Sequence, residues 1–470
     1  MVISTLREIA LNRQERAVSK TKTYQDLLDL GDNEKDRMEF VLKAIAEHKQ
    51  SDSYKIARDA ELYYQHQNPT IMRFQRFVYD RFGRKVPDVW SPNNKIASNW
   101  YNYFTDQAVQ YLLGNGVSFK GKETHDKLGA DIDHQLQEIS TTAKNGGVGF
   151  GFWNLDHVDV FKLTEFAPLW DEEDGSLKAG IRWWQISDEK PLRATLYEMD
   201  GYTQYIRRKD EDVRVFADKK PYIQVSRVSE ASGEEILEGE NYSGFPIVPM
   251  WNVNKQSDLV GNRGTIDAYD LMVSGLINNV SEGEFLYWIL TNCDGMNNDE
   301  VNQFIEQLKL NHVAKADGGT DGSRVESHQA TVPFEASAEA IKQLESQLFR
   351  DFMALRVDDI AAGATNDQIQ AAYEPLNQKT DKFEYQVTDF IQRILALAGI
   401  DDEPTYTRSQ MSNRAETAEI IMADTGLLSR QYKTKKLLTL LGDIDSVDEV
   451  EKELLEEEAT RYTGVEVTEE

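Results

Sequence analysis

The sequence has one cysteine, Cys293, among 470 residues. A single thiol excludes an intrachain disulfide framework and any zinc site built from cysteines. No run approaches the ~20 consecutive apolar residues that cross a bilayer, and the mean hydropathy is -0.57. The first twenty residues reach charged positions too early for a secretory signal peptide. We therefore expect a chain without a membrane segment that works in a reducing cytosol or starts there.

Basic residues are scarce relative to acidic ones. The chain has 52 Lys and Arg against 81 Asp and Glu, a formal net charge of -29 and a pI near 4.7. Binding a nucleic-acid backbone over the outer surface needs clustered Lys and Arg, so the composition argues against it. Residues 443–470 contain 12 acids and 2 bases. This block predicts a solvated acidic helix and tail.

Helical patterns dominate the first part of the chain. Apolar residues recur at helical spacing up to residue 53 and again over residues 54–64, which predicts amphipathic surface helices. A longer helix is predicted from Asn94, because aromatic residues recur every three or four positions after it. The Gly-Asn-Gly turn at 114–116 is expected to end this helix.

The apolar period changes from 3.6 to 2 between about residues 147 and 251. Short runs there are rich in aromatic and β-branched residues, which favours strands. The Asp-Gly pairs at 174–175 and 200–201 are strong hairpin signals. This antiparallel sheet region lies between helical regions, so the predicted fold class is α+β.

Helical patterns return in the second half. Residues 266–290 predict a helix of nearly 40 Å, at about 1.5 Å per residue. The turn-rich residues 358–367 separate two further long helices, and Pro375 is expected to kink the second one near its start. The remaining expected elements are a short helix at 299–310, a hairpin of 312–316 with 324–331, and helices at 334–355 and up to Leu397.

Motifs for ordinary enzyme chemistry are weak. Residues 116–122 fit G-x-x-x-x-G-K, but Glu123 stands where a P-loop needs Ser or Thr to hold Mg²⁺. Asp131, Asp133 and His134 are more often a solvated group than a metal site. The glycine-rich run 146–151 lacks the dinucleotide spacing and is expected to start a tightly packed strand. We therefore predict no catalytic residue, no metal and no cofactor.

Four groups of segments, in order, resemble the portal proteins of tailed double-stranded DNA bacteriophages. Two departures are mild: Gly116 stands where the family usually has proline, and Gln67 where it has glycine. The resemblance covers about residues 55–458. The segments are 60–64 (AELYY) with 67–69, 94–99 (NKIASN) and 111–119 (YLLGNGVSF); 245–252 (FPIVPMWN), 266–274 (IDAYDLMVS) and 278–279; 371–379 (AAYEPLNQK) with 383–384; and 406–408, 412–419 (SNRAETAE) and 425–429 (TGLLS).

The resemblance implies a portal fold with long stem and spine helices, an antiparallel β-rich wing, a small α/β clip and a helical crown. It also implies a ring oligomer, usually a dodecamer, closed by heterologous contacts. The implied divisions are wing 1–262, stem helix 263–290, clip 291–334, stem helix 335–357, tunnel loop 358–368, spine helix of the wing 369–400, and crown with acidic tail 401–470.

The implied function is that of a head-tail connector in the virion, at the portal vertex of the capsid, assembled in the host cytoplasm. Its ring channel would pass double-stranded DNA during packaging and ejection. The implied partners are further copies of the chain, major capsid and scaffolding proteins, the terminase large subunit and a head-tail adaptor. Two alternatives remain: a nucleotide-driven DNA-packaging enzyme subunit, and a cytosolic binding scaffold that forms no ring.

The stem helix offers candidate ring contacts, since small side chains let neighbouring helices approach closely. The basic and imidazole side chains of the clip stand out in an acidic chain and are candidates for docking, although they can equally balance nearby acids. The ring-contact candidates are Ser274, Gly275 and Asn278; the clip candidates are Lys309, His312, Lys315, Arg324 and His328.

The segment between the stem and spine helices is a candidate DNA tunnel loop. Its glycine and alanines give little side chain to anchor it, and Asn366 and Asp367 suit a helix N-cap. A ring would bring acidic side chains of this loop around the DNA and repel phosphates. The alternative is an ordinary turn on the outside. The candidates are Asp358, Asp359, Gly363, Asn366 and Gln368.

Overall fold

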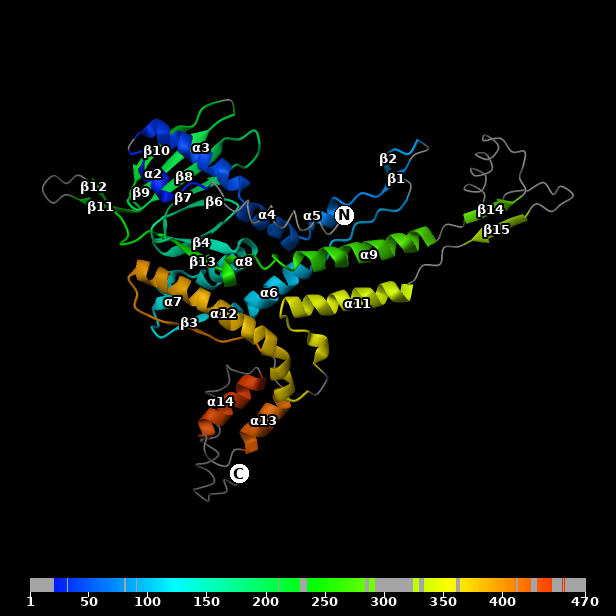
Figure 1. Ribbon diagram of the computed structural model, residues 1–470. Helices are drawn as coiled ribbons and strands as arrows, with labels where there is room; N and C mark the ends of the chain where they lie inside the picture. The colour runs from blue at the N-terminus through cyan, green and yellow to red at the C-terminus, as the bar shows by residue number, and fades with distance from the viewer. Residues whose placement is uncertain are drawn as a thin grey trace, which may run out of the picture.

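The computed structural model confirms an α+β chain. Two antiparallel sheets and their covering helices form a body, from which a two-helix arm extends to one side, while a pair of short helices lies at another end (Figure 1). The structure describes residues 21–31, 33–79, 82–89, 91–209, 211–228, 235–283, 287–291, 324–328, 334–360, 364–410, 413–423, 429–441, 450 and 452.

Polar caps start the N-terminal helices. The side chains of Thr23, Asn33 and Ser51 each accept a backbone N–H from the first turn of the helix that follows, which satisfies a donor that has no helical partner. The helices are α2 (Tyr24–Leu28), α3 (Glu34–Gln50), α4 (Asp52–Tyr64) and α5 (Pro69–Met72). The predicted helical patterns are therefore confirmed over residues 24–64, while residues 1–20 lie outside the described part of the chain.

The larger sheet is a five-stranded antiparallel meander in the order β10-β9-β8-β7-β6. Both Asp-Gly hairpin predictions are confirmed: Gly175 has a φ of 68° between β6 and β7, and Gly201 pairs with Glu198 across β8 and β9. Helices α2 and α3 cover one face of this sheet with apolar side chains. The strands are β6 (Phe166–Trp170), β7 (Leu177–Trp184), β8 (Leu192–Glu198), β9 (Gly201–Arg207) and β10 (Arg214–Lys220).

The smaller sheet, in the order β13-β4-β5, is pressed between helices. A Cβ at Gly149 would lie 3.0 Å from Ile139, and one at Gly151 would lie 2.5 Å from the ring of Phe390. The glycine-rich run therefore starts a tightly packed strand, as predicted. The elements are β4 (Val148–Asn154), β5 (His157–Lys162), β13 (Ile247–Trp251), α6 (Trp100–Leu113), α8 (Ile132–Gly146) and α12 (Asn366–Ala398).

Helices α9 (Arg263–Gly283) and α11 (Phe334–Asp351) lie side by side and form the arm (Figure 1). Aromatic rings fill the root of the arm, where it meets α6. Phe104 stacks on Phe352 with ring centroids 4.6 Å apart, and Phe349 meets Phe104 edge-on at 5.2 Å. This packing joins both arm helices to the body.

Two predictions about this region need correction. The helix predicted over 266–290 ends at Gly283, because the aromatic and β-branched residues after it form β14 (Tyr287–Thr291). That strand pairs with β15 (Arg324–His328), while residues 312–316, the predicted hairpin partner of 324–331, lie outside the described residues. The helix predicted from Asn94 starts at Trp100 instead. The short helix predicted at 299–310 also lies outside the described residues.

The long helix α12 runs for 33 residues and contains Pro375. It bends along its course, as the proline predicts (Figure 1). Thr365, not Asn366 or Asp367, is the N-cap: its side chain accepts the N–H of Gln368 in a capping box. Gly399 closes the other end with a φ of 69°. Helix α11 likewise ends at Asp351, before the predicted Leu355.

The remaining elements are short. β3 pairs with β16, which ties the chain leaving α12 back to the body, and β1 pairs with β2 in a separate hairpin. They are β1 (Phe77–Tyr79), β2 (Lys85–Pro87), β3 (Val117–Phe119), α7 (Thr124–Leu128), β11 (Ile223–Val228), β12 (Glu235–Glu240), the 3-10 turns Val253–Lys255 and Val357–Asp359, β16 (Pro404–Tyr406), α13 (Arg414–Ala423) and α14 (Arg430–Leu441).

Candidate assembly and channel surfaces

An extended strap, residues 94–98, lies along α9 and is held by a ladder of side chains. The N–H of Asn94 donates to Oδ1 of Asn278 at 2.7 Å, and the N–H of Ile96 donates to Oγ of Ser274 at 3.0 Å. The N–H of Ser98 donates to Oδ1 of Asp270 at 2.9 Å. Two residues of extended chain and four residues of helix each advance about 6–7 Å, so the two spacings match.

The ladder explains the polar residues in α9. Ser274 and Asn278 are buried under the strap of their own chain, whereas nothing lies within 4 Å of a Cβ built at Gly275. Of the three predicted ring-contact residues, only Gly275 therefore faces open space in one copy. The sequence does contain a signal for the ladder. Asp270, Ser274 and Asn278 place a hydrogen-bond acceptor at every fourth position of one helix, and the polar residues 94–98 precede another.

A buried ion cluster fixes the segment that precedes α9. Oδ2 of Asp258 lies 3.5 Å from Nζ of Lys144 on α8 and 3.3 Å from Nζ of Lys379 on α12. Asn252 donates to Oδ1 of the same carboxylate at 2.7 Å. Nζ of Lys144 also lies 4.0 Å from the centre of the Phe383 ring. One carboxylate thus connects the sheet-covering helix, the long helix and the start of the arm.

The cluster shifts the protonation of its members. Burial lowers the pKa of Lys144 to about 8, although the Asp258 carboxylate opposes this shift. Burial alone would raise the pKa of Asp258, but Lys144 and Lys379 hold it well below its ordinary value. Sequence reasoning missed this cluster, because its members are 114 and 121 residues apart along the chain.

The predicted tunnel loop is described in part. Asp358 is exposed, whereas Gly363 and the side chain of Asp359 lie outside the described part of the chain. Asn366 is engaged inside the chain: its N–H donates to Glu416 at 2.7 Å, and its Oδ1 accepts the N–H of Asn413 at 2.8 Å. Gln368 belongs to the capping box. Asn366 therefore joins the long helix to α13, Gln368 helps to cap the long helix, and Asp358 stays the exposed candidate.

Most of the clip candidates lie outside the part of the chain that the structure describes. Lys309, His312 and Lys315 lie outside the described residues. Arg324 and His328 are the end residues of β15, paired with Thr291 and Tyr287 of β14, respectively. Their side chains are not described, so docking by these five residues stays a prediction.

The turn that resembles a P-loop is filled by the chain's own carboxylate. Oδ2 of Asp402 accepts the N–H of Gly121 at 2.9 Å and the hydroxyl of Thr124 at 2.6 Å, while Oδ1 accepts the N–H of Lys120 at 3.2 Å. The Thr124 hydroxyl and the Gly121 N–H lower the pKa of Asp402 to about 2. An anion already occupies the place where a nucleotide phosphate would sit.

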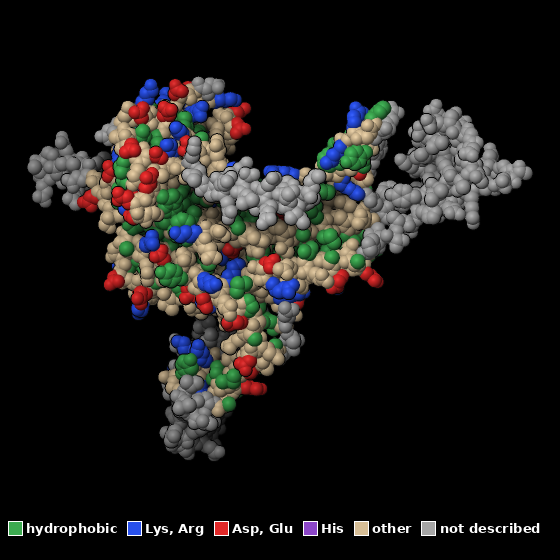
Figure 2. Space-filling view, viewed as in Figure 1, with side chains coloured by type: hydrophobic (Ala, Val, Ile, Leu, Met, Phe, Trp, Pro, Cys, Tyr) green, Lys and Arg blue, Asp and Glu red, His purple; other side chains and the backbone are tan. Residues whose placement is uncertain are grey.

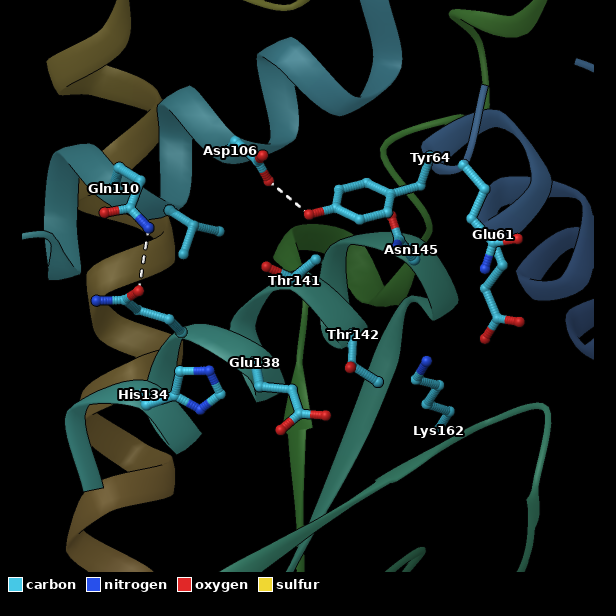
Figure 3. A pocket seen from close by; sticks show the side chains of 13 residues that line it. Glu61, Tyr64, Asp106, Gln110, His134, Glu138, Thr141, Thr142, Asn145 and Lys162 are labelled. Carbon is cyan, nitrogen blue, oxygen red and sulfur yellow. Dashed lines mark hydrogen bonds between the residues drawn. The ribbon is translucent and has the colours of Figure 1, made fainter. Parts of the chain in front are cut away.

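A cleft of about 490 Å³ lies between α4, α6 and α8 (Figure 3). Tyr64 donates to Asp106 at 2.7 Å and Gln110 donates to Gln137 at 3.0 Å, which are the interactions drawn in the figure. His134 stands apart from both pairs. Tyr64 and Asp106, and likewise Gln110 and Gln137, thus form structural pairs rather than an arrangement around one reacting atom.

The described ranges contain neither a metal-binding cluster nor a membrane-spanning helix. No group of three or more His, Cys, Asp or Glu side chains there is placed to hold a metal ion. Asp133, a candidate from the sequence, instead accepts the N–H of Val117 at 2.9 Å and contacts His125 at 3.1 Å. Within this described part of the chain, every helix is too short or too polar to cross a bilayer.

Comparison with known sequences gives a consistent result. The sequence model of the family described as phage portal protein, SPP1 Gp6-like, matches residues 42–463. The chain is 24% identical over 466 residues to the portal protein of Bacillus phage SPP1, covering 90% of this chain and 86% of that protein. It is 25% identical over 407 residues to the portal protein of Clostridium phage phiCD119, covering 79% and 87%. The family match includes the arm, the long helix and the body from residue 42 on.

Proposed function

Because the chain belongs to the SPP1 Gp6-like family of phage portal proteins, we propose that its copies close into a ring of twelve at one capsid vertex. The ring is a head-tail connector: double-stranded DNA enters and leaves the capsid through its channel. The family match over residues 42–463 carries this proposal. The alternative of a nucleotide-driven enzyme has no support, since Asp402 occupies the P-loop-like turn.

The arrangement of the chain supports the proposal. We assign the body to the wing, α9 and α11 to the stem, β14 and β15 to the clip, α12 to the spine and α13 and α14 to the crown. The clip and crown elements lie at separate ends of the molecule (Figure 1). This separation suits a connector, because one end can meet external partners while the other faces the capsid interior.

The charge of the chain also supports a channel through which DNA slides. A net charge of -29 provides little attraction for phosphates. Asp358 is exposed between the stem and spine helices, and twelve copies would surround the DNA with negative charge. Shortening residues 360–365 should leave rings intact and impair DNA packaging or retention; full packaging by that variant would remove the loop from the channel.

The proposed partners are the major capsid and scaffolding proteins, the terminase large subunit and then a head-tail adaptor. The chain acts by binding these partners and has no catalytic step of its own. We propose that the clip docks the terminase and the adaptor in turn. Reversing the charge of Lys315 and Arg324 should weaken both interactions while the ring stays whole. Unchanged binding would place docking elsewhere.

Mass measurement tests the ring itself. Light scattering of the purified chain should give about twelve times 53.7 kDa, and negative-stain images should show rings with a central hole. A monomeric enzyme or a scaffold without a ring would give 53.7 kDa or an irregular aggregate. That result would contradict the proposed function.

A further inference from the structure

The β1–β2 hairpin carries large apolar side chains into solvent. Tyr79 is 76% exposed, Phe82 66% and Phe77 48%. The hairpin projects from the body beside the arm (Figure 1), and green apolar atoms are visible on it in the space-filling view (Figure 2). A separate two-stranded hairpin is at best marginally stable in water. Such an apolar surface is typical of a protein contact.

The hairpin is also basic, in a chain that is strongly acidic. Residues 72–89 contain five Arg and Lys against two Asp. Nζ of Lys85 lies 4.2 Å from the centre of the Phe77 ring, and the guanidinium of Arg84 lies 5.2 Å from that of Phe82. The projecting surface therefore combines aromatic rings with positive charge, which favours an acidic partner with an accessible apolar face.

The arm of the same chain offers such a face. Gly264, Ala268, Leu271 and Gly275 recur at i, i+4, i+7 and i+11, so they share one side of α9. Leu271 is exposed, and a Cβ at Gly264 or Gly275 would meet nothing within 4 Å. This side adjoins the side of Asp270 and Ser274 that the strap covers, and Asn278, seven residues after Leu271, lies at its border. It is a smooth strip on which an aromatic hairpin can lie flat.

Charge favours the same pairing. Helices α9 and α11 together contain seven acidic and three basic residues, whereas the hairpin segment has an excess of bases. The hairpin and the arm as a whole are thus opposite in net charge. The exposed acids Glu335 and Glu339 belong to α11, whereas Asp270 of α9 is buried under the strap. A surface that fits another surface of an identical copy makes a head-to-tail contact, which closes into a ring when the rotation allows it.

We propose that the β1–β2 hairpin of each copy docks on the Gly264–Gly275 face of α9 in the next copy. The inference rests on the proposed ring and names one contact within it. The partner is a second copy of this chain, and the contact is directional: each copy gives its hairpin to one neighbour and receives a hairpin from the other.

Cysteine cross-linking tests the contact. In a Cys293→Ser background, Tyr79→Cys combined with Gly275→Cys should give a ladder of covalent oligomers on mild oxidation. Each single variant should give none, and neither should the matched pair Leu155→Cys with Gly275→Cys. Leu155 is similarly exposed, at 53%, but lies in the β4–β5 turn. A ladder that passes well beyond the dimer supports the head-to-tail contact.

The other outcomes are separable. A product that stops at the dimer indicates a two-fold contact and overturns the proposal. No ladder in a variant that light scattering shows as a ring overturns the hairpin contact and leaves the proposed function intact. A wild-type mass of 53.7 kDa overturns the ring and with it this contact.

A second variant gives an independent measurement. Phe77→Ser with Tyr79→Ser should raise the concentration at which rings form by about tenfold or more, because aromatic anchors dominate interface energies. Phe216→Ser, which removes a similarly exposed ring from β10, should leave that concentration unchanged. Equal effects of the two changes would show a general surface effect and overturn the proposal.

Discussion

The root and the middle of α9 are held in different ways. At the root, Asp258 is buried between two lysines, which lower its pKa. In the middle, Asp270 is buried among neutral donors, the Ser98 N–H and the Asn68 amide, and burial raises its pKa. Cations permit a buried carboxylate to stay ionised, whereas neutral donors only reduce the cost of burying it.

The ion cluster and the ladder have different structural effects. The ion cluster joins three separate elements at one point, so it fixes where the arm starts. The ladder repeats one hydrogen bond at three positions, so it fixes the direction in which the strap runs along the arm. A change at the root should therefore have a large effect on the whole fold, and a change in the ladder a smaller and more local one.

Asp258→Asn should have the largest effect on stability. It leaves the buried Lys144 and the half-buried Lys379 without their counter-charge, and we expect a loss of about 3–5 kcal/mol in the free energy of unfolding. Denaturant unfolding at one fixed protein concentration measures it, since assembly makes stability concentration-dependent. Asp188→Asn, at an exposed turn, is the control. Equal stability of the two variants would show that the cluster does not hold the root.

The second largest effect should be seen in the pH dependence of stability when Lys144 is replaced. In the unfolded chain Lys144 has its ordinary pKa of 10.5, whereas in the folded chain its pKa is about 8. Between these values the unfolded state binds more protons, so the free energy of unfolding gains up to about 1.4 kcal/mol per pH unit from this group. Lys144→Met should remove that gain. Parallel stability curves for both proteins from pH 8 to 10 would contradict the assignment.

Ladder variants should cost less. Ser274→Ala removes one acceptor and should reduce stability by about 0.5–1.5 kcal/mol. It should also speed hydrogen exchange in a peptide covering residues 94–98, while exchange in α11 stays unchanged. Ser281→Ala is the matched control: its hydroxyl donates to the Ile277 carbonyl of its own helix and does not touch the strap. Faster strap exchange in the control as well would assign the effect to α9 as a whole.

Asp402→Ala should have the smallest effect, because this carboxylate lies at an exposed turn. We expect faster hydrogen exchange at residues 120–124 and unchanged global unfolding. The variant should also gain no ATP hydrolysis, since Glu123 still occupies the Mg²⁺-binding position of the P-loop pattern. Measurable ATP hydrolysis in the variant would reopen the enzyme alternative.

The sequence predicted local structure well and long-range contacts poorly. The two Asp-Gly hairpins and the bend at Pro375 depend on neighbouring residues, so short patterns were sufficient for them. The end of α9 was missed because residues 284–290 are apolar enough to extend a helical pattern, although aromatic and β-branched residues there favour a strand. These residues fit either a helix or a strand by composition, and the pairing with β15 decides for the strand.

The candidate sites show the same limit. Ser274 and Asn278 were predicted as candidate ring contacts, and nothing local indicated that residues 94–98 cover them. Asn366 was assigned to a loop facing DNA, whereas its bonds to Asn413 and Glu416 depend on a segment almost 50 residues away. Family resemblance identified the kind of protein, because it compares the order of many segments at once rather than one residue's surroundings.

Helix α12 has a mechanical consequence. At about 1.5 Å per residue its 33 residues form a lever of roughly 50 Å. Phe390 anchors one part of it against Gly151 in the small sheet, while the other end begins beside the proposed channel loop. Pro375 removes a backbone hydrogen bond between those two ends and provides a compliant joint. If the loop lines the channel as proposed, we expect a push on it by passing DNA to be taken up as rotation at this joint, with little movement of the sheet behind it.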